Sequence, residues 1–576
     1  MGNEESGRRS MVFPDLRKGL NARCVGLAND GLGVARIEDE KAKENGMKVF
    51  VEDMLPEERG RVRVTRKESG RTFAEKLETT SPSPYRVEPA CPEFGVCGGC
   101  QLQHADYACQ LRMKEAMVRN CLVRIGGFSE QEVRDCMEPI LGANETNFYR
   151  NQMQYPVEYN RDKNCVEIGL NRRNSHKIVE HEKCYLAHPT AEIVRKVAQY
   201  FFSAPSRLEQ ARALRQVVVR VGTVAKEMMI IFVIRKQVRI DADDFALACA
   251  KALSQAGKGT RLVSMWTEER PETTKWKNPK GVWTNIWGER YIHEFLENRI
   301  FRISPESFFQ VNTKQAVALY GKVKEYLRMD GALPRLLLDL YCGTGSIGIY
   351  CSDACHHLIG IESVESAIID ARVNAATNYI EDTEFICGKA EDYDFGVIMP
   401  DAIIVDPPRK GCDEQLLKKI LKLAPTRIIY VSCNPATLAR DLKTFFQLQE
   451  TADVHYGIKK ICPVDMFPMT AHVETVVQLS KGSVPSQDVK VKFSMENVSS
   501  AQYLDKPATY DQIKAYVKEH SGLNVSSLYI AQVKQKYRII ERDCYNLPKS
   551  DDSRQPKCPE HKEKAIVDAL TYYKMI

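Results

Sequence analysis

Short apolar runs that break into polar residues and prolines recur between Leu336 and Ser480. Two of them, Ile403 to Val405 in IIVDPPRKG and Ile428 to Val431 in IIYVSCNPATLARDL, are typical of parallel strands buried on both faces. Ligands of an open α/β sheet bind beyond the carboxyl ends of its strands. We therefore expect Asp406 and Cys433, which follow the two runs, to face one crevice. This position makes Cys433 a candidate nucleophile; the alternative is a buried structural thiol.

A glycine-rich turn follows another apolar run, LLLDL, which ends at Leu340. The sequence YCGTGSIG places Gly343, Gly345 and Gly348 in a G-x-G-x-x-G pattern, and Glu362 ends the next predicted strand, LIGIE. This arrangement predicts an adenosine site, in which the carboxylate accepts hydrogen bonds from ribose hydroxyls. A nicotinamide dinucleotide and S-adenosylmethionine both fit this pattern. Asp-Pro-Pro and Ser-Cys-Asn at the same rim, without a dehydrogenase-like acid–base pair, favour S-adenosylmethionine.

The chain before this region has two other patterns. From Leu20 to about Glu78, apolar and polar residues alternate between glycine turns, which is typical of a small β-barrel. Arginines and lysines gather in its later part, where they either form a solvated edge or contact an RNA backbone. From about 145 to 300, strand-like and helix-like segments mix, which predicts an α+β platform for a large substrate.

Three cysteines share a glycine-rich loop in a C-x5-C-x2-C pattern: Cys91, Cys97 and Cys100. A metal or cluster bound there needs a fourth ligand, and the later candidates are His181, Cys184 and Cys165. Cys184 is favoured because it stands in a turn-like polar segment. Four thiolates suit either zinc or an iron–sulfur cluster, and spacing does not choose between them.

The residues after Lys481 form a separate pattern. Helices are predicted from Thr509 to about Gly522, from Ser526, and from about Glu560 to Tyr573. This segment is either an RNA- or ribosome-binding appendix or a packed tail.

Composition sets the class of protein. A chain of 576 residues is too long for one hydrophobic core, and 43% hydrophobic and 27% charged residues are ordinary for a soluble protein. The net charge of +6 permits a nucleic-acid partner without requiring one. The start MGNEESGRRS lacks an apolar secretory segment, and no apolar run approaches a membrane span. We therefore expect no membrane partner, a reducing cytoplasmic location with mostly free cysteines, and no obligate protein partner.

These motifs resemble those of the RNA uracil-5-methyltransferase family, the S-adenosylmethionine-dependent enzymes that make 5-methyluridine. DPPRKG and IIYVSCNPAT match the family signature, DMFPMTAHVETV matches its closing motif, and FFQVN matches its cofactor-side motif. ANDGLGVAR and FVEDMLPEE are similar to the family's TRAM barrel. The loop CPEFGVCGGCQLQH is similar to that of the ribosomal-RNA members, which carry a 4Fe-4S cluster. The resemblance covers roughly residues 18 to 482.

The resemblance implies roles for individual residues. Cys433 would add to carbon 6 of uracil, and Glu474 would remove the proton from carbon 5 after methyl transfer. The residues expected around S-adenosylmethionine, including one from the glycine turn, are Gln310, Tyr341, Gly343, Glu362 and Asp406. The family pattern places the 4Fe-4S cluster on Cys91, Cys97, Cys100 and Cys184.

Pattern and resemblance together predict a multidomain α/β protein. Its parts are a flexible N-terminus (1–17), a TRAM/OB-like β-barrel (18–80), the cysteine loop with a central α+β RNA-binding region (81–300), a Rossmann-like class I methyltransferase domain (301–482) and a small helical appendix (483–576).

The expected reaction is methylation of uracil carbon 5 in bacterial 23S ribosomal RNA. The cysteine loop and the barrel favour this substrate, because compact tRNA-specific relatives resemble only the later part of the chain. The alternatives are the same reaction on tRNA, amino-group methylation of adenine beside an Asp-Pro-Pro motif, and a non-catalytic RNA-binding protein.

Overall fold

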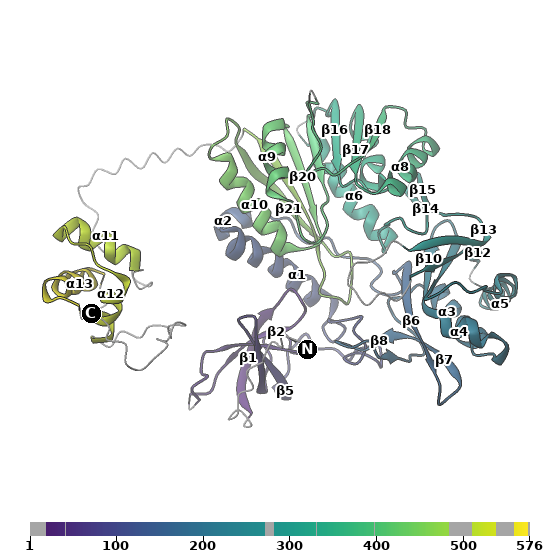
Figure 1. Ribbon diagram of the computed structural model, residues 1–576, viewed down its shortest axis with the longest axis horizontal. Coiled ribbons are helices and arrows are strands. Elements are labelled where there is room, and N and C mark those ends of the chain that lie inside the picture. Colours follow the sequence, from purple (N-terminus) through teal and green to yellow (C-terminus); the bar gives the residue numbers. More distant parts are fainter. Residues whose placement is uncertain are drawn as a thin grey trace, which may run out of the picture. The chain divides into compact units, whose positions relative to one another are not determined.

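The computed structural model describes residues 19–40, 42–257, 259–270, 281–329, 331–396, 398–482, 510–536 and 558–573. The chain divides into two compact units, Met1–Ser486 and Gln487–Ile576, and Figure 1 shows the elements of each. The predicted flexible N-terminus (1–17) lies outside the described residues, as does the start of the predicted appendix.

A closed five-stranded β-barrel begins the first unit, in the order β1-β2-β3-β5-β4. Its strands are β1 (Leu20–Leu27), β2 (Gly33–Ile37), β3 (Lys48–Val51), β4 (Arg59–Glu68) and β5 (Arg71–Ser81). Burial alternates along β1 and β4, because successive side chains of a strand point to opposite faces, so small apolar residues fill the barrel. The alternating pattern from Leu20 therefore predicted this element correctly.

A seven-stranded sheet forms the later part of the unit, in the order β18-β17-β16-β19-β20-β22-β21. Its strands are β16 (Leu336–Leu340), β17 (His357–Glu362), β18 (Thr383–Cys387), β19 (Ala402–Val405), β20 (Arg427–Ser432), β21 (Tyr456–Val464) and β22 (Glu474–Lys481). The first five run parallel, whereas β22 runs antiparallel to both β20 and β21. The strand order reverses between β16 and β19, and the crevice beyond their carboxyl ends is where such sheets bind ligands.

Helices cover both faces of this sheet (Figure 1). They are α6 (Thr313–Arg328), α7 (Ser346–Tyr350), α8 (Glu365–Thr377), α9 (Glu414–Leu423) and α10 (Pro435–Gln449). Along β19, Ile403 packs with the α9 and α10 side, whereas Ile404 packs with the α6 side. Burial on both faces explains why this strand is uniformly apolar.

The central region is a six-stranded sheet in the order β13-β12-β11-β10-β6-β7. Its strands are β6 (Gln152–Asn160), β7 (Cys165–Ile168), β10 (Leu214–Gly222), β11 (Glu227–Ile234), β12 (Arg261–Glu269) and β13 (Val282–Gly288). One face packs against α3 (Pro189–Phe202) and α5 (Ala242–Gln255), with the short α4 (Leu208–Ala213) nearby. The other face joins the core of the seven-stranded sheet. A short pair, β8 (Leu170–Asn171) and β9 (Ile178–Val179), lies beside the cysteine loop.

Two boundaries differ from the predicted domains. Helices α1 (Tyr107–Cys121) and α2 (Glu130–Cys136), joined by the π-helical segment Leu122–Gly126, were assigned to the central region but pack in the core of the seven-stranded sheet. The predicted boundary at residue 300 falls inside β15 (Arg299–Ile303), which pairs with β14 (Ile292–Leu296) in the core shared with α6. Amphipathic patterns show that a segment is half-buried, but not which sheet covers it.

The second unit has its own small apolar core between three helices: α11 (Tyr510–Ser521), α12 (Ser527–Lys536) and α13 (Glu560–Tyr572). These bounds agree with the helices predicted for the appendix. Across the described parts of both units, no helix combines the length and apolar character needed to cross a lipid bilayer.

Candidate functional site

A cavity of about 620 Å³ opens beyond the carboxyl ends of β16, β17, β19 and β20. It is lined by all seven side chains or glycines predicted for catalysis and for the cofactor: Gln310, Tyr341, Gly343, Glu362, Asp406, Cys433 and Glu474. Gln310 comes from the segment before α6 and Glu474 from the start of β22, so residues far apart in the chain meet at one sheet edge.

Cys433 occupies the turn between β20 and α10. Asn434 caps the helix by accepting a hydrogen bond from the backbone N–H of Ala436 over 3.1 Å, and Pro435 starts the first turn. The thiol therefore lies next to the amino end of a fifteen-residue helix, where the helix dipole favours negative charge.

Burial nevertheless opposes ionisation of the thiol. Burial and the nearby Glu474 and Asp406 together raise the pKa of Cys433 to about 11, although Arg409 acts to lower it. The free protein therefore holds a neutral thiol at neutral pH. A positive charge at Arg409, or a neighbouring group that accepts the proton, favours the thiolate.

Glu474 begins β22 and faces Val464 at the end of β21, where the two strands close into a hairpin. Its side chain is almost fully buried. Burial and, less strongly, Asp406 raise the pKa of Glu474 to about 8, although Arg409 acts to lower it. Burial also raises the pKa of Asp406 to about 7. Both carboxyl groups can therefore exchange protons near neutral pH, as acid–base catalysis requires.

The glycine turn follows β16 and lines the same cavity through Gly343. Gly343 and Gly345 have φ angles of 55° and 74°, a region that favours glycine. The carboxylate of Glu362 accepts hydrogen bonds from the backbone N–H groups of Gly343 (3.3 Å) and Val364 (2.9 Å), which fixes it at the end of β17. The arrangement suits a nucleoside whose ribose contacts a carboxylate.

Tyr341 also has a positive φ, 63°, although it is not glycine. Its hydroxyl donates a hydrogen bond to Glu391 over 2.8 Å. A strained backbone held by such a contact is common at ligand sites.

Sequence reasoning missed several lining residues. Phe308 is 69% exposed beside Gln310, and Phe467 and His472 flank the cavity from the β21–β22 loop. All three lie inside the quoted motifs FFQVN and DMFPMTAHVETV. The motifs therefore pointed to these residues, but no role was predicted for them. Lys389 and Glu391, which also line the cavity, follow β18 and belong to none of the motifs.

The four predicted cluster ligands line a second cavity of about 290 Å³: Cys91, Cys97, Cys100 and Cys184. Of the other candidates, Cys165 does not line it, while His181 does but lies 3.2 Å from Glu192. Within the described residues, no three or more His, Cys, Asp or Glu side chains are grouped so as to hold a metal ion. The four thiols are free and line one cavity.

Comparisons with known proteins agree with this geometry. A family model described as tRNA (Uracil-5-)-methyltransferase matches residues 286–482. An uncharacterized RNA methyltransferase of Bacillus cereus is 37% identical over 467 residues, which span 79% of this chain and 95% of the relative. A second, from Oceanobacillus iheyensis, is 36% identical with the same coverage.

A solved structure is also similar. The Pyrococcus abyssi tRNA (uracil-54, C5)-methyltransferase, in complex with S-adenosyl-L-homocysteine, has a TM-score of 0.60 and 27% identity, and covers 80% of this chain and 99% of its own. This tRNA enzyme aligns with most of the chain, so the expectation that tRNA-specific relatives resemble only the later part does not hold for it.

Proposed function

Because the chain belongs to the RNA uracil-5-methyltransferase family and S-adenosylmethionine-dependent RNA methylation is its activity, we propose that Cys433 and Glu474 carry out the reaction as nucleophile and base. The observation that supports this assignment is that both residues line the same cavity as the predicted cofactor residues. The adenine-methylation alternative requires no cysteine at this position, and the description of the matching family names uracil carbon 5.

The proposed steps follow from the chemistry of uracil. Carbon 5 is a poor nucleophile, so the Cys433 thiolate first adds to carbon 6, and the electron pair of the 5,6 double bond moves toward the carbonyl oxygen to give an enolate. Carbon 5 of that enolate then takes the methyl group that S-adenosylmethionine would supply, and S-adenosylhomocysteine would leave. Glu474 removes the remaining proton from carbon 5, the double bond re-forms, and the thiolate leaves.

The charges in the cavity bear on the first step. Arg409 lowers the pKa of Cys433 and also that of Glu474. A uracil that fills the cavity excludes water, and an electrostatic contact is stronger where water is excluded. Arg409 therefore favours both ionised forms that the reaction uses. The target base must leave its stack to reach Cys433.

The cofactor side has its own proposed contacts. Glu362 would bind the ribose hydroxyls, since its carboxylate is already held at the end of β17. Tyr341 would cover the adenosine or methionine portion, and Gln310 and Gly343 would line the same part of the cavity. Asp406 follows β19, the strand between β16 and β20, and would contact the cofactor or the uracil.

We also propose that the four cysteines hold a 4Fe-4S cluster. The support is a donor set of four free thiols around one cavity. The cluster would act in structure or RNA positioning, since methyl transfer requires no electron. Iron and acid-labile sulfide are measured in anaerobically purified protein, with Cys184→Ser as the test and Cys165→Ser as the control. Iron-free wild type at full activity, or equal iron in both variants, would remove the cluster from the proposal.

The substrate is proposed to be 23S ribosomal RNA, on the resemblance of the cysteine loop. Transfer RNA is the second candidate, favoured by the likeness to the Pyrococcus abyssi tRNA enzyme. The barrel offers a face for an RNA backbone, because the Arg66 and Arg71 guanidinium groups stack on the ring of Phe73 at 4.3 and 5.3 Å.

Every described cysteine is free, which supports the predicted cytoplasmic location.

Mass spectrometry of RNA from a gene-deletion strain tests the substrate. Loss of 5-methyluridine from ribosomal RNA supports the first choice, and loss from tRNA alone reverses it. Purified protein is then incubated with each RNA and labelled S-adenosylmethionine. No transfer to either RNA contradicts the proposed reaction.

A further inference from the structure

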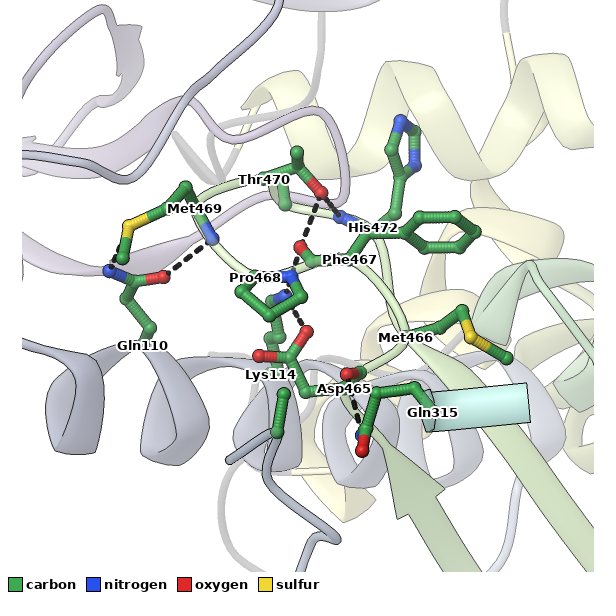
Figure 2. A network of polar contacts seen from close by, with 12 residues as sticks. Gln110, Lys114, Gln315, Asp465, Met466, Phe467, Pro468, Met469, Thr470 and His472 are labelled. Atoms are coloured by element: carbon green, nitrogen blue, oxygen red, sulfur yellow. Dashed lines mark hydrogen bonds and ion pairs between the residues drawn. The ribbon is translucent and has the colours of Figure 1, made fainter. Parts of the chain in front are cut away.

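The loop between β21 and β22, residues 465–473, is held in place by a network of buried polar contacts (Figure 2). It joins Val464 to Glu474, and its own residues Phe467 and His472 line the reaction cavity. The loop therefore sets where one of the two proposed catalytic side chains lies.

An ion pair from α1 holds the first residue of the loop. The ammonium of Lys114 lies 2.5 Å from one carboxylate oxygen of Asp465, and both side chains are fully buried. The other oxygen accepts a hydrogen bond from the Tyr107 hydroxyl over 2.9 Å. Lys114 also donates to the backbone carbonyl of Phe467 over 3.0 Å. Two buried charges cost desolvation energy, and here each charged group has a second hydrogen-bond partner that offsets part of that cost.

A second contact from α1 holds the far side of the loop. Gln110 accepts a hydrogen bond from the backbone N–H of Met469 over 3.0 Å, and its amide donates to the Met469 sulfur over 3.3 Å. Met469 has a φ of 67°, which is strained for a residue with a side chain. Its carbonyl accepts from the N–H groups of Gln101 and Leu102, just after the cysteine loop. The strained backbone persists because contacts on both sides fix it.

Gln110 and Lys114 are four residues apart, so they share one face of α1. The same buried face continues along α1, where Met117 and Val118 pack in the core of the sheet, and α1 also contacts α10, the helix that follows Cys433. One rigid helix therefore contacts both the Cys433 helix and the Glu474 loop.

We propose that Lys114 and Gln110 are positioning residues that hold the β21–β22 loop so that Glu474 reaches the carbon 5 proton. This inference rests on the proposed function, since it takes Glu474 as the base. Cys433 is fixed separately, by the turn that Asn434 caps. Loss of the α1 contacts should therefore slow proton removal and leave addition and methyl transfer nearly unchanged.

The test is a single-turnover assay on RNA with labelled S-adenosylmethionine, in which covalent protein–RNA adduct and released product are followed in time. The variant is Lys114→Met with Asp465→Asn, which removes both charges at similar volume and leaves no buried ion unpaired. We expect this variant to form the adduct at the normal rate. Decay of the methylated adduct should be about 10-fold to 100-fold slower, because a misplaced catalytic group lowers the rate by that factor. Gln110→Met, which leaves the ion pair intact, should give a smaller change of the same kind.

Two controls separate positioning from general damage. Lys322→Met removes a lysine whose ion pairs with Glu138 and Glu325 lie outside the loop, and its adduct should decay at the wild-type rate. The same charge-neutral change is then made in a Glu474→Gln background. If Lys114 acts through Glu474, adding the charge-neutral change to Glu474→Gln should slow the decay by no more than about a further twofold. Independent changes would instead multiply their separate effects.

Each outcome either supports or contradicts the positioning role. Equal slowing of addition and decay, or additive slowing in the Glu474→Gln background, overturns the positioning role. If Glu474→Gln itself accumulates no adduct, the proposed function fails. If Glu474→Gln accumulates adduct while the α1 variants behave as wild type, the inference about α1 alone fails. Should the double variant not fold, Gln110→Met carries the test.

Discussion

The side-chain amide of Asn434 donates a hydrogen bond over 3.2 Å to the backbone carbonyl of Arg409. Thr437 donates to the same carbonyl over 3.3 Å. The turn that carries Cys433 and the loop that carries Arg409 are therefore tied together at the first turn of α10. Because Arg409 lowers the pKa of Cys433, this tie connects backbone geometry with the charge state of the nucleophile.

Replacing Asn434 separates its two contacts. Asn434→Ala removes the helix cap and the contact with Arg409, and should lower the free energy of unfolding by about 1 kcal/mol. Asn434→Ser keeps a capping oxygen but is too short to reach Arg409, so it should retain most of the stability. Both variants should form the RNA adduct more slowly. Urea unfolding measures the first effect and single-turnover kinetics the second; wild-type adduct formation by both variants would show that the tie has no role.

Cys433→Ala should abolish covalent attachment to RNA and the production of 5-methyluridine. The side chain contributes the bond to carbon 6, and none of the cavity's other proposed roles depends on it. Binding of S-adenosylmethionine, measured by calorimetry, should stay near the wild-type value because the cofactor end of the cavity is unchanged. Cys412→Ala, which removes a buried cysteine near Asp441 in the segment between β19 and α9, is the matched control and should keep the adduct. Turnover by Cys433→Ala would favour the adenine reaction instead.

Glu474→Gln should let a methylated adduct accumulate, because the final proton stays on carbon 5. General-base catalysis contributes about 10²–10⁴-fold, and the decay of the adduct should slow by that amount. In the wild type, the base form of a carboxyl with a pKa of about 8 increases with pH, so decay should speed up from pH 6 to about 8. A gel without a slow-migrating RNA band for Glu474→Gln would count against this assignment.

The raised pKa of Glu474 also predicts how stability depends on pH. Between its usual value of 4.5 and about 8, the folded protein keeps a proton that the unfolded chain releases. Stability from this group is therefore present at low pH and is lost as pH rises through that window, by at most about 1.4 kcal/mol per unit. Glu474→Gln cannot titrate, so its stability should fall less over the same range. The free energy of unfolding is measured with denaturant across this pH range for both proteins. If it changes equally in wild type and Glu474→Gln, the carboxyl ionises as it does in water.

The edge of the catalytic sheet could be predicted from sequence because its strands are buried on both faces. Apolar runs then stop where the side chains must meet a ligand, which marks Asp406 and Cys433 directly. The helical appendix was predictable for a different reason, since local capping and breaking residues determine its ends, as at Gly522 after α11.

The contacts of α1 could not be predicted in this way. From the sequence, Lys114 is expected to be an ordinary solvent-exposed lysine on a helix. In the structure it is fully buried against Asp465, 351 residues further along the chain. Periodicity identifies the buried face of a helix, whereas the partner of a buried charge depends on tertiary packing. The same limit explains why α1 was placed in the central region and why Phe467 and His472 carried no predicted role.

Removal of the appendix tests whether the catalytic unit stands without it. The second unit has its own apolar core, and the Bacillus cereus relative is matched over 95% of its length by 79% of this chain. A chain ending at Ser486 should therefore fold, and methyl transfer to a short uracil-containing RNA should stay within about twofold of the full chain, as expected of independent domains. Transfer to the full-length RNA substrate is measured beside it. A loss confined to the long RNA assigns the appendix to substrate binding, whereas a loss on both RNAs would show that the catalytic unit depends on it for folding.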